Sequence, residues 1–383
     1  LGLIFAVAVS TAEPADIVLL NARIYTVDPH LKLAQALAIR EGRIIAVGTS
    51  EEMKHWTGPE TKVLDLEGKL VLPGFNDAHT HLGHAGAELV SVNLKGTRSI
   101  ADFQQRIRAR LADYQPGEWV TGSGWDQSLW AENRYPTRAD LDPVSSEHPM
   151  MFTRVDGHSA IVNSRALALA GITRDTPNPE GGEIVRDAAG EPTGWLKESA
   201  TELVTRLIPE PTMEWRKRAL AAALAEAARY GVTSVQDDSV RFGSWENFLA
   251  MRELKNEGKL TLRITEWLPF DLPVEKLKEM QREGGTEDPW LRTGALKFQV
   301  DGSGGSRTAA MFEPFAVEPD NRGMLILEPE QLKQMVIERD AAGFQMALHA
   351  IGDRAIRVTL DAFETARETN GRRDARHKIE HVQ

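Results

Sequence analysis

Cysteine is absent from the 383 residues of this chain. Its absence excludes disulfide bonds, iron–sulfur clusters and zinc sites built from thiolates, because each of them needs a cysteine sulfur. An excess of positive charge is missing as well: 45 lysines and arginines stand against 56 aspartates and glutamates, for a net charge of −11 at pH 7. We therefore expect no nucleic acid and no anionic membrane surface as a partner, since both attract a positive face.

Apolar runs long enough to cross a bilayer are also missing, since a spanning helix needs about 20 apolar residues. The chain opens with a short apolar stretch followed by small residues, LGLIFAVAVSTAEPAD. This stretch resembles the end of a secretory signal peptide whose charged start is missing. Residues 1–13 are therefore expected to be a signal-peptide remnant of a periplasmic or secreted protein. The alternatives are a buried first strand and a cytoplasmic protein. We expect no membrane association once such a signal is removed.

Residues 14–72 predict a small β domain. Three runs rich in β-forming residues, ADIVLLNARIYTV, ALAIREGRIIAVG and KVLDLEGKLVLPG, are separated by turn residues. Glu41 and Gly42 form a dipeptide that favours the centre of a hairpin. We expect an antiparallel sheet here that forms the N-terminal part of a β-sandwich domain.

A different order of elements begins near residue 212. The segment TMEWRKRALAAALAEAARYG favours a helix with Thr212 as its N-cap and Gly231 as its stop, and the strand-like VTSVQDD follows. Two further pairs repeat this order: PEQLKQMVIERDAAG before FQMALHAIGD, and DRAIRVTLDAFETARETNG before RHKIEHVQ. Helix and strand in alternation are typical of β/α units on a parallel sheet. In the last helix, Ile356, Leu360 and Phe363 would share the apolar face.

These units predict an α/β fold, a (β/α)8 TIM-like barrel over residues 73–84 and 231–383. Residues 85–230 separate the first predicted strand from the second and are rich in tryptophan, proline and glycine. They are too many for a βα loop, so we expect an inserted subdomain over the barrel mouth. Trp125 and His158 lie in this insert and are predicted to contact substrate. Ordinary core packing is the alternative for the tryptophan.

Two histidines end the first predicted barrel strand, PGFNDAHTHL. Side chains two apart on a strand point to the same side, so His79 and His81 face one way. Such a pair alone is compatible with a metal site, a hydrogen-bonded polar pair or chance. Lys297, His349 and His381 lie in or at the ends of other predicted strands, and a (β/α)8 barrel builds its active site at the carboxyl ends of its strands. The five residues together are far more specific than any one of them.

The order His-x-His, Lys, His, His along the predicted strands resembles the amidohydrolase superfamily. Four segments, KFQVDGSGGSRTAAM, DGHSAIVNSRAL, HAIGDRAI and RHKIEHVQ, resemble its amidohydrolase 3 branch, which includes N-substituted formamide deformylase. The similarity runs from about residue 16 to the last residue. We therefore use this branch to interpret the five residues.

The resemblance implies a centre of two divalent metal ions, zinc or similar. His79 and His81 would bind the first ion, and His349 and His381 the second. Lys297 would carry a carbamate derived from CO2 and bridge both ions. Neutral imidazole suits zinc, whereas a protonated lysine cannot bind a metal, and carboxylation turns that cation into an anionic ligand with two oxygens. Water bound to the metals would then ionise near neutral pH.

One element of the family pattern is missing from this sequence. The aspartate of the eighth strand, which in that family takes a proton from the bridging water, would lie beyond Gln383. The chain ends inside the sixth predicted strand, so we expect a barrel truncated after strand 6, with the catalytic residue unknown. Asp301 and Arg307, in the loop that leaves the fourth strand, are further candidates for substrate contact.

The resemblance favours hydrolysis of a non-peptide C–N bond, of amide or formamide type, in a small molecule. Phosphoester or lactone hydrolysis is the alternative within enzymes, because the same binuclear site suits those reactions. Charges near the predicted mouth are mixed, with Asp126 and Asp301 near Arg307, which favours C–N substrates over phosphates. A secreted binding or regulatory protein without catalysis is an alternative of another class. The sequence leaves the oligomeric state open, including a homodimer.

Overall fold

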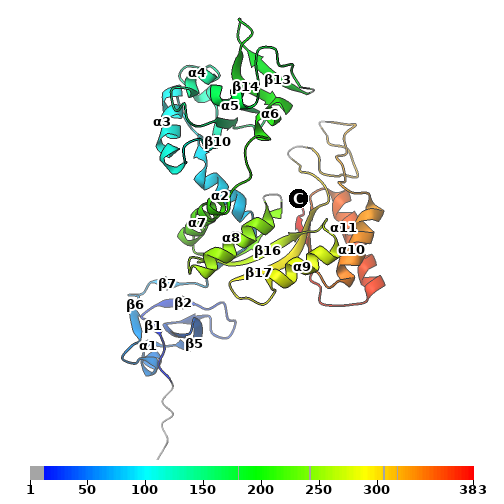
Figure 1. The fold of residues 1–383 in the computed structure, drawn as a ribbon. Helices are drawn as coiled ribbons and strands as arrows, with labels where there is room; N and C mark the ends of the chain where they lie inside the picture. Colours follow the sequence, from blue (N-terminus) through cyan, green and yellow to red (C-terminus); the bar gives the residue numbers. More distant parts are fainter. Residues whose placement is uncertain (1–12, 180, 241–242, 305–306, 317) are drawn as a thin grey trace, which may run out of the picture. The chain divides into compact units, whose positions relative to one another are not determined.

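The computed structural model describes five segments of the chain: 13–179, 181–240, 243–304, 307–316 and 318–383. Residues 1–12, which are most of the predicted signal-peptide remnant, lie outside them. The chain divides into two compact units, one that ends at Phe75 and one that runs from Asn76 to Gln383 (Figure 1). Among the helices of the described segments, none is long and apolar enough to cross a membrane.

The N-terminal unit contains two small sheets, drawn in blue in Figure 1. The larger has the order β5-β4-β1-β6 and consists of β1 (Ile17–Leu20), β4 (Ala36–Arg40), β5 (Arg43–Gly48) and β6 (Lys62–Asp65). The smaller has the order β3-β2-β7 and consists of β2 (Arg23–Tyr25), β3 (Leu33–Ala34) and β7 (Leu70–Val71). Between β5 and β6 lie the short helix α1 (Ser50–Met53) and the 3-10 turn η1 (Lys54–Trp56).

The predicted hairpin between β4 and β5 is confirmed. Glu41 and Gly42 adopt φ values of 49° and 71°, the left-handed values that a tight two-residue turn requires, and Arg40 pairs with Arg43 across it. The expectation of a purely antiparallel sheet is wrong, because β1 runs parallel to β6 and β2 runs parallel to β7. The segment of α1 and η1 turns the chain between β5 and β6, so that β6 can run in the same direction as β1.

The second unit contains a curled parallel sheet, an open half-barrel with strand order β19-β18-β17-β16-β15-β8. The six strands are β8 (Phe75–Thr80), β15 (Val232–Asp237), β16 (Arg263–Pro269), β17 (Leu291–Gln299), β18 (Met346–Ala350) and β19 (Lys378–His381). β8, β15, β18 and β19 overlap the strands predicted from PGFNDAHTHL, VTSVQDD, FQMALHAIGD and RHKIEHVQ. The α/β class and the parallel sheet are therefore confirmed.

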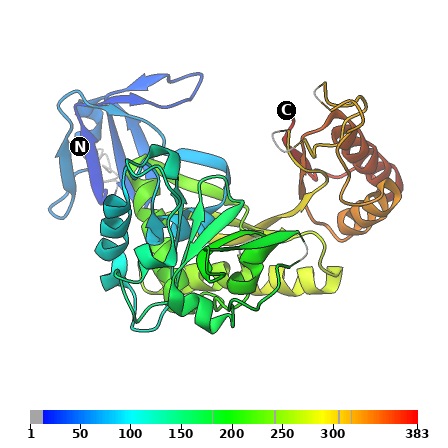
Figure 2. The same cartoon turned by 90° about the horizontal axis from the view of Figure 1, so that it is seen from above.

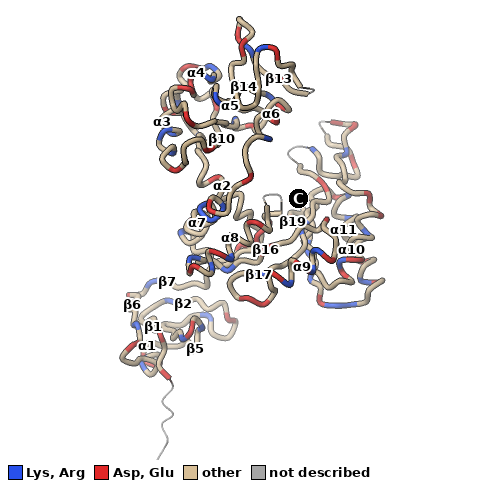
Figure 3. The backbone as a smooth tube through the Cα atoms, in the orientation of Figure 1, with Lys and Arg blue, Asp and Glu red and all other residues tan. Residues whose placement is uncertain are grey.

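Five helices alternate with these strands in the described chain: α7 (Met213–Arg229), α8 (Ser244–Asn256), α9 (Val274–Gly284), α10 (Pro329–Ala341) and α11 (Asp353–Asn370). The predicted start of α7 is confirmed, because the hydroxyl of Thr212 accepts a hydrogen bond of 3.2 Å from the backbone N–H of Trp215. Its predicted stop is confirmed as well, since Gly231 follows the helix at a left-handed φ of 72°. Positions of lysine and arginine alternate with positions of aspartate and glutamate along the backbone of these helices (Figure 3).

The predicted apolar face of helix α11 is confirmed only in part. Ile356 and Phe363 are half-buried and pack against the apolar core, whereas Leu360 is 49% exposed. The buried positions of the helix are instead small: Ala355, Thr359, Ala362 and Ala366. Helices α10 and α11 lie side by side in both views (Figures 1 and 2), and small residues are what such a close approach requires.

Between β8 and α7 the chain forms α2 (Leu82–Val90) and then a separate mixed sheet with the order β13-β14-β12-β11-β10-β9. Its strands are β9 (Val92–Asn93), β10 (Val120–Trp125), β11 (Met150–Arg154), β12 (Ser159–Val162), β13 (Gly182–Arg186) and β14 (Pro192–Glu198). Its helices and 3-10 turns are α3 (Ile100–Arg110), η2 (Leu111–Asp113), η3 (Gln127–Leu129), α4 (Arg138–Leu141), α5 (Ser164–Leu169), η4 (Ser199–Thr201) and α6 (Glu202–Thr205). This part has its own apolar core, which includes Phe103 and Phe152.

Candidate metal centre

The five residues predicted as metal ligands lie at or near the carboxyl ends of the half-barrel strands. His79 is in β8, Lys297 in β17 and His349 in β18, while His381 ends β19. His81 follows β8 directly, as the residue before α2. Because all these strands belong to one parallel sheet, their carboxyl ends share an edge, which brings residues from distant parts of the chain together.

The four histidine rings form a continuous cluster. The ring centroid of His79 lies 5.3 Å from that of His81 and 5.0 Å from that of His381. The centroids of His381 and His349 are 4.5 Å apart. The structure therefore brings together the histidines that the sequence pattern grouped.

Asp238, which follows β15, joins this cluster. Its Oδ2 lies 3.6 Å from Nε2 of His79 and 3.9 Å from Nδ1 of His81, and it accepts a hydrogen bond from the ammonium of Lys297. Asp238 and Lys297 are both buried. Donor atoms of His79, His81 and Asp238 all lie within 4.8 Å of one another, an arrangement that can hold a metal ion.

Asp238 was not among the site residues predicted from the sequence. The signal was its position at the end of a predicted strand, where it stands next to a second carboxylate, Asp237. The structure separates their roles: Asp237 is completely buried, and its Oδ1 accepts a hydrogen bond of 2.6 Å from the backbone N–H of Leu82. Asp237 therefore fixes the start of α2, and Asp238 faces the histidines.

Backbone carbonyls fix the tautomers of two rings. Nδ1 of His81 donates to the carbonyl oxygen of Asp238, and Nε2 of His349 donates over 2.9 Å to that of Gly302. A carbonyl oxygen can only accept, so these two nitrogens carry the ring protons. The opposite nitrogen of each ring, Nε2 of His81 and Nδ1 of His349, is then the one with a lone pair for a metal.

The ring of His79 is oriented by a carboxylate and not by a backbone carbonyl. Its Nδ1 lies 2.7 Å from Oε2 of Glu380, the residue before His381. Its Nε2 is buried and makes no hydrogen bond to the described residues. A buried polar nitrogen without a partner is costly, and a metal ion next to Asp238 would satisfy it. The donor set therefore fits a metal.

Partial burial and neighbouring charges favour the neutral form of His381 and the ionised form of Glu380 through shifts in their pKa values. Burial lowers the pKa of His381, and the positive charges that His349, His79 and Lys297 can carry lower it further. For Glu380, burial works to raise the pKa, but the hydrogen bond from His79 and the charge of Lys378 outweigh it, so the pKa falls below its ordinary value. Neutral imidazole and ionised carboxylate are the forms that bind or orient a metal.

Trp267 in β16 packs against the histidine cluster. It is fully buried, and its ring centroid lies 5.3 Å from that of His79. The ammonium groups of Lys378 and Lys297 lie 4.3 Å and 5.5 Å from the tryptophan ring centroid, within the range of cation–π attraction. The sequence analysis did not single out this residue.

A further acidic residue, Glu266, is buried within the half-barrel sheet. Glu266 of β16 is completely buried, and neither carboxyl oxygen makes a hydrogen bond within the described structure. Burial and the negative charges of Asp237 and Asp238 raise the pKa of Glu266 well above its ordinary value. Burial also raises the pKa of Asp237. Two adjacent buried carboxyl groups cannot both ionise at low cost, which favours the neutral form of Glu266.

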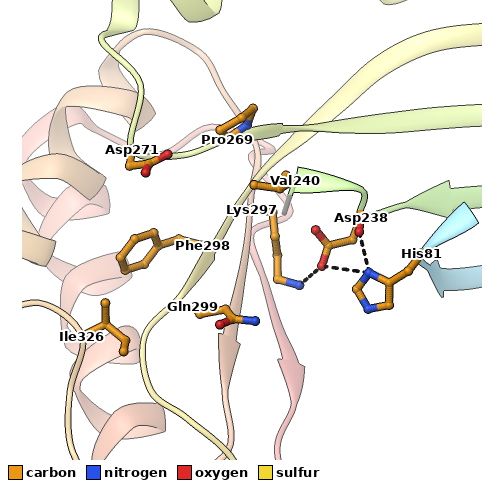
Figure 4. A pocket seen from close by; sticks show the side chains of 9 residues that line it. All are labelled: His81, Asp238, Val240, Pro269, Asp271, Lys297, Phe298, Gln299 and Ile326. Atoms are coloured by element: carbon orange, nitrogen blue, oxygen red, sulfur yellow. Dashed lines mark hydrogen bonds and ion pairs between the residues drawn. The ribbon is translucent and has the colours of Figure 1, made fainter. Parts of the chain in front are cut away.

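A pocket of about 370 Å³ opens beside the ion pair of Asp238 and Lys297. It is lined by His81, Asp238, Val240, Pro269, Asp271, Lys297, Phe298, Gln299 and Ile326 (Figure 4). Figure 4 shows the Asp238 carboxylate between the Lys297 ammonium and the His81 ring, with the apolar Phe298 and Ile326 on the far side. Its size and its few converging polar groups suit a small molecule.

The predicted substrate contacts in the insert lie elsewhere. Trp125 is completely buried in the core of the insert, where its Nε1 donates a hydrogen bond of 2.8 Å to the carbonyl of Phe152. This is the core-packing alternative, and the position does not support a substrate contact. The side chain of His158 is 71% exposed and pairs with Glu198, 3.2 Å away, rather than lining the pocket.

The predicted contacts in the loop after β17 also differ from expectation. Asp301 is completely buried, and its carboxylate accepts hydrogen bonds from the backbone N–H groups of Ala310, Ile351 and Gly352. These three hydrogen bonds give Asp301 a structural role, and its position does not support the predicted substrate contact. Arg307 is exposed and pairs with Glu318, so it does not line the pocket either.

Comparison with known proteins agrees with the sequence resemblance. The model of the amidohydrolase family (Amidohydro_3) matches residues 62–383. The chain is 35% identical over 376 residues to Protein LONG AFTER FAR-RED 3 of Arabidopsis thaliana, covering 96% of this chain and 64% of that protein. It is 30% identical over 378 residues to N-substituted formamide deformylase of Arthrobacter pascens, covering 96% and 69%.

A solved structure supports the same assignment. The crystal structure of an uncharacterized metal-dependent hydrolase from Pyrococcus furiosus matches with a TM-score of 0.76 and 31% identity, over 96% of this chain and 72% of that one. The chain therefore belongs to the amidohydrolase family, and its fold is that of a metal-dependent hydrolase. It spans less than two thirds of the length of the plant relative.

Proposed function

We propose that the protein hydrolyses a non-peptide C–N bond, of amide or formamide type, in a small molecule with the help of bound divalent metal. The observation that carries this proposal is the convergence of His79, His81 and Asp238 within 4.8 Å beside a pocket of small-molecule size. The relative named N-substituted formamide deformylase supports the type of bond.

The proposed centre holds two divalent ions, with zinc as the first choice because imidazole nitrogens dominate the donor set. His79 and His81 would hold the first ion, and His349 and His381 the second. The buried Nε2 of His79, which makes no hydrogen bond to the described residues, supports this assignment. Asp238 adds a carboxylate oxygen that the sequence resemblance did not include.

Lys297 is proposed to bridge the two ions as a carbamate. The neutral amine attacks the carbon of CO2, an N–C bond forms, one C=O electron pair moves onto oxygen, and the nitrogen releases a proton to water. The ammonium form seen here is paired with Asp238. Carboxylation would reverse the charge of Lys297 and end this ion pair, so that both Asp238 and the carbamate could face metal.

When bound, the metals would supply a water that ionises near neutral pH and would polarise the substrate carbonyl. The chain itself orients the rings of His79 and His81 through their oxygen partners, and the Trp267 ring packs edge-on against the ring of His79. The carboxylate of Asp301 is buried and accepts three backbone hydrogen bonds, which disfavours it as the proton acceptor.

The alternative of phosphoester hydrolysis is less well supported by the pocket. Among its described lining residues, Lys297 is the one lysine or arginine, and Asp238 already pairs with it. Asp271 at the far side adds negative charge that would repel a phosphate. A neutral amide or formamide fits this lining better.

Metal content and turnover test the proposal together. The full chain, purified without chelator and then supplied with Zn²⁺, should hold about one to two divalent ions by elemental analysis. It should release formate or amine from a panel of N-substituted formamides and amides, and a matched panel of phosphoesters and lactones tests the alternative reactions. His79→Ala/His81→Ala should lose at least one equivalent of metal. Absence of metal would overturn the proposal, and bound metal without turnover of any C–N substrate would favour a binding protein.

A further inference from the structure

The contact between His79 and Glu380 joins the two edges of the half-barrel. His79 lies in β8 and Glu380 in β19, which are the first and last strands in the order of the sheet. Their side chains nevertheless meet, with Nδ1 of His79 2.7 Å from Oε2 of Glu380. The Nε2 of the same ring makes no hydrogen bond to the described residues, so the contact at Nδ1 bears directly on what Nε2 can bind.

We infer that Glu380 is the positioning residue of His79: its carboxylate accepts the Nδ1 proton and thereby directs the Nε2 lone pair toward a metal. The inference rests on the proposed metal centre. A ring nitrogen binds metal only through its lone pair, so the tautomer decides which nitrogen is available. Glu380 at Nδ1 selects the tautomer in which Nε2 faces Asp238, 3.6 Å away.

The surroundings of Glu380 hold it in this role. Its second oxygen, Oε1, lies 3.4 Å from the ammonium of Lys378, so each oxygen has a separate partner. Its side chain is only 13% exposed, which limits competition by water. The ring of Trp267 packs edge-on against the His79 ring at 5.3 Å and restricts its rotation. A carboxylate hydrogen-bonded to a metal-binding histidine makes the ring more basic and fixes its direction.

A second histidine–glutamate pair in the chain can be compared with the pair of His79 and Glu380. His158 Nδ1 lies 3.2 Å from Oε2 of Glu198, so the same two groups meet through the same atoms. There both side chains are more than half exposed, and no cluster of metal donors among the described residues includes them. Removal of Glu198 therefore controls for the loss of any glutamate–histidine pair. It leaves the proposed centre intact.

The experiment compares the full-length wild type with Glu380→Ala, Glu380→Gln and Glu198→Gln. Zn²⁺ affinity is measured by competition with a chromophoric chelator, and the ring tautomers are read by ¹⁵N NMR of histidine-labelled, metal-free protein. We expect Glu380→Ala to lower Zn²⁺ affinity about 10–100-fold and to remove the Nδ1–H tautomer of His79. Glu380→Gln keeps a neutral acceptor at that place, so it should retain the tautomer and lose less affinity. Glu198→Gln should match the wild type.

The outcomes separate this inference from the proposed function. Unchanged Zn²⁺ affinity together with an unchanged His79 tautomer in Glu380→Ala overturns the positioning role while the metal centre stands. A wild type that binds no Zn²⁺ overturns the proposed function, and the tautomer comparison then decides alone whether Glu380 orients the ring. If Glu380→Ala does not fold by circular dichroism, the isosteric Glu380→Gln carries the test. A Zn²⁺ affinity for this variant equal to that of the wild type overturns the inference.

Discussion

The carboxylate of Asp301 accepts a hydrogen bond of 2.8 Å from the backbone N–H of Gly352, which joins the loop after β17 to the start of α11. The same carboxylate also accepts from the backbone N–H groups of Ala310 and Ile351, at 2.9 Å and 3.0 Å. Asp301 thus holds two neighbouring loops together at the carboxyl edge of the sheet. Its Oδ1 lies 3.5 Å from Nε2 of His349, so it also helps to hold that ring in place.

Replacement of this carboxylate should cost much stability. Asp301→Ala leaves three buried backbone N–H groups without an acceptor, and each such group costs about 1–3 kcal/mol. We expect the free energy of unfolding to fall by about 3 kcal/mol or more, measured by urea denaturation. Asp320→Ala, an exposed position in the same loop, should change it by no more than about 0.5 kcal/mol. Equal stabilities of the two variants would contradict the role given to Asp301.

The buried ion pair of Asp238 and Lys297 should show strong coupling in the metal-free protein. Asp238→Asn leaves a buried ammonium without its carboxylate, which typically costs about 3–5 kcal/mol. Lys297→Met leaves the carboxylate alone and should cost a similar amount. The double variant removes both charges, so its loss should be well below the sum of the two single losses. Urea unfolding in the presence of a chelator measures the cycle, and additive losses would show that the pair does not interact.

The carbamate proposal predicts a difference between Lys297→Arg and Lys297→Glu. Arginine keeps the charge but forms no carbamate and does not bind metal, so Lys297→Arg should lose the second ion and the activity. Glutamate supplies two carboxylate oxygens and should retain part of the metal. Elemental analysis after incubation with Zn²⁺ and bicarbonate gives the number of bound ions. Full metal content and activity in Lys297→Arg would contradict the carbamate.

The buried Glu266 should make stability depend on pH. Its pKa in the folded protein is raised well above the ordinary value of 4.5, so the folded state holds a proton that the unfolded state releases. Stability from this group is complete below the unfolded pKa and is lost as pH rises toward the folded pKa. Glu266→Gln removes the titration. We expect its stability to fall less than that of the wild type between pH 5 and pH 8, measured by urea unfolding, and parallel pH curves would contradict this.

The half-barrel and its histidine cluster could be predicted from the sequence for a physical reason. A strand buried on both faces is a short apolar run, so a histidine inside it, such as His349 within Met346–Ala350, is conspicuous. Parallel strands put their carboxyl ends together regardless of the length of chain between them. Five strand-end residues could therefore be placed at one site without knowledge of the intervening fold.

Other features depend on contacts that local pattern does not encode. Asp237 and Asp238 are adjacent in sequence, but the chain leaves the strand between them, so strand alternation no longer tells which carboxylate faces the histidines. The burial of Trp125 depends on Phe152, which lies 27 residues away in another strand. The insert itself is built from strands as short as two residues, such as Val92–Asn93, which leave almost no periodic signal.

The meeting of His79 and Glu380 also has a consequence for how the protein folds. The two residues are 301 positions apart in the chain, and they belong to the outermost strands of the sheet. Contacts between such distant positions carry a large loop-closure entropy, so they form late, after nearer pairs have assembled. In a partly folded chain, the histidine rings are therefore not yet held close together. Binding of a ligand by these histidines therefore requires that both outermost strands of the half-barrel are in place.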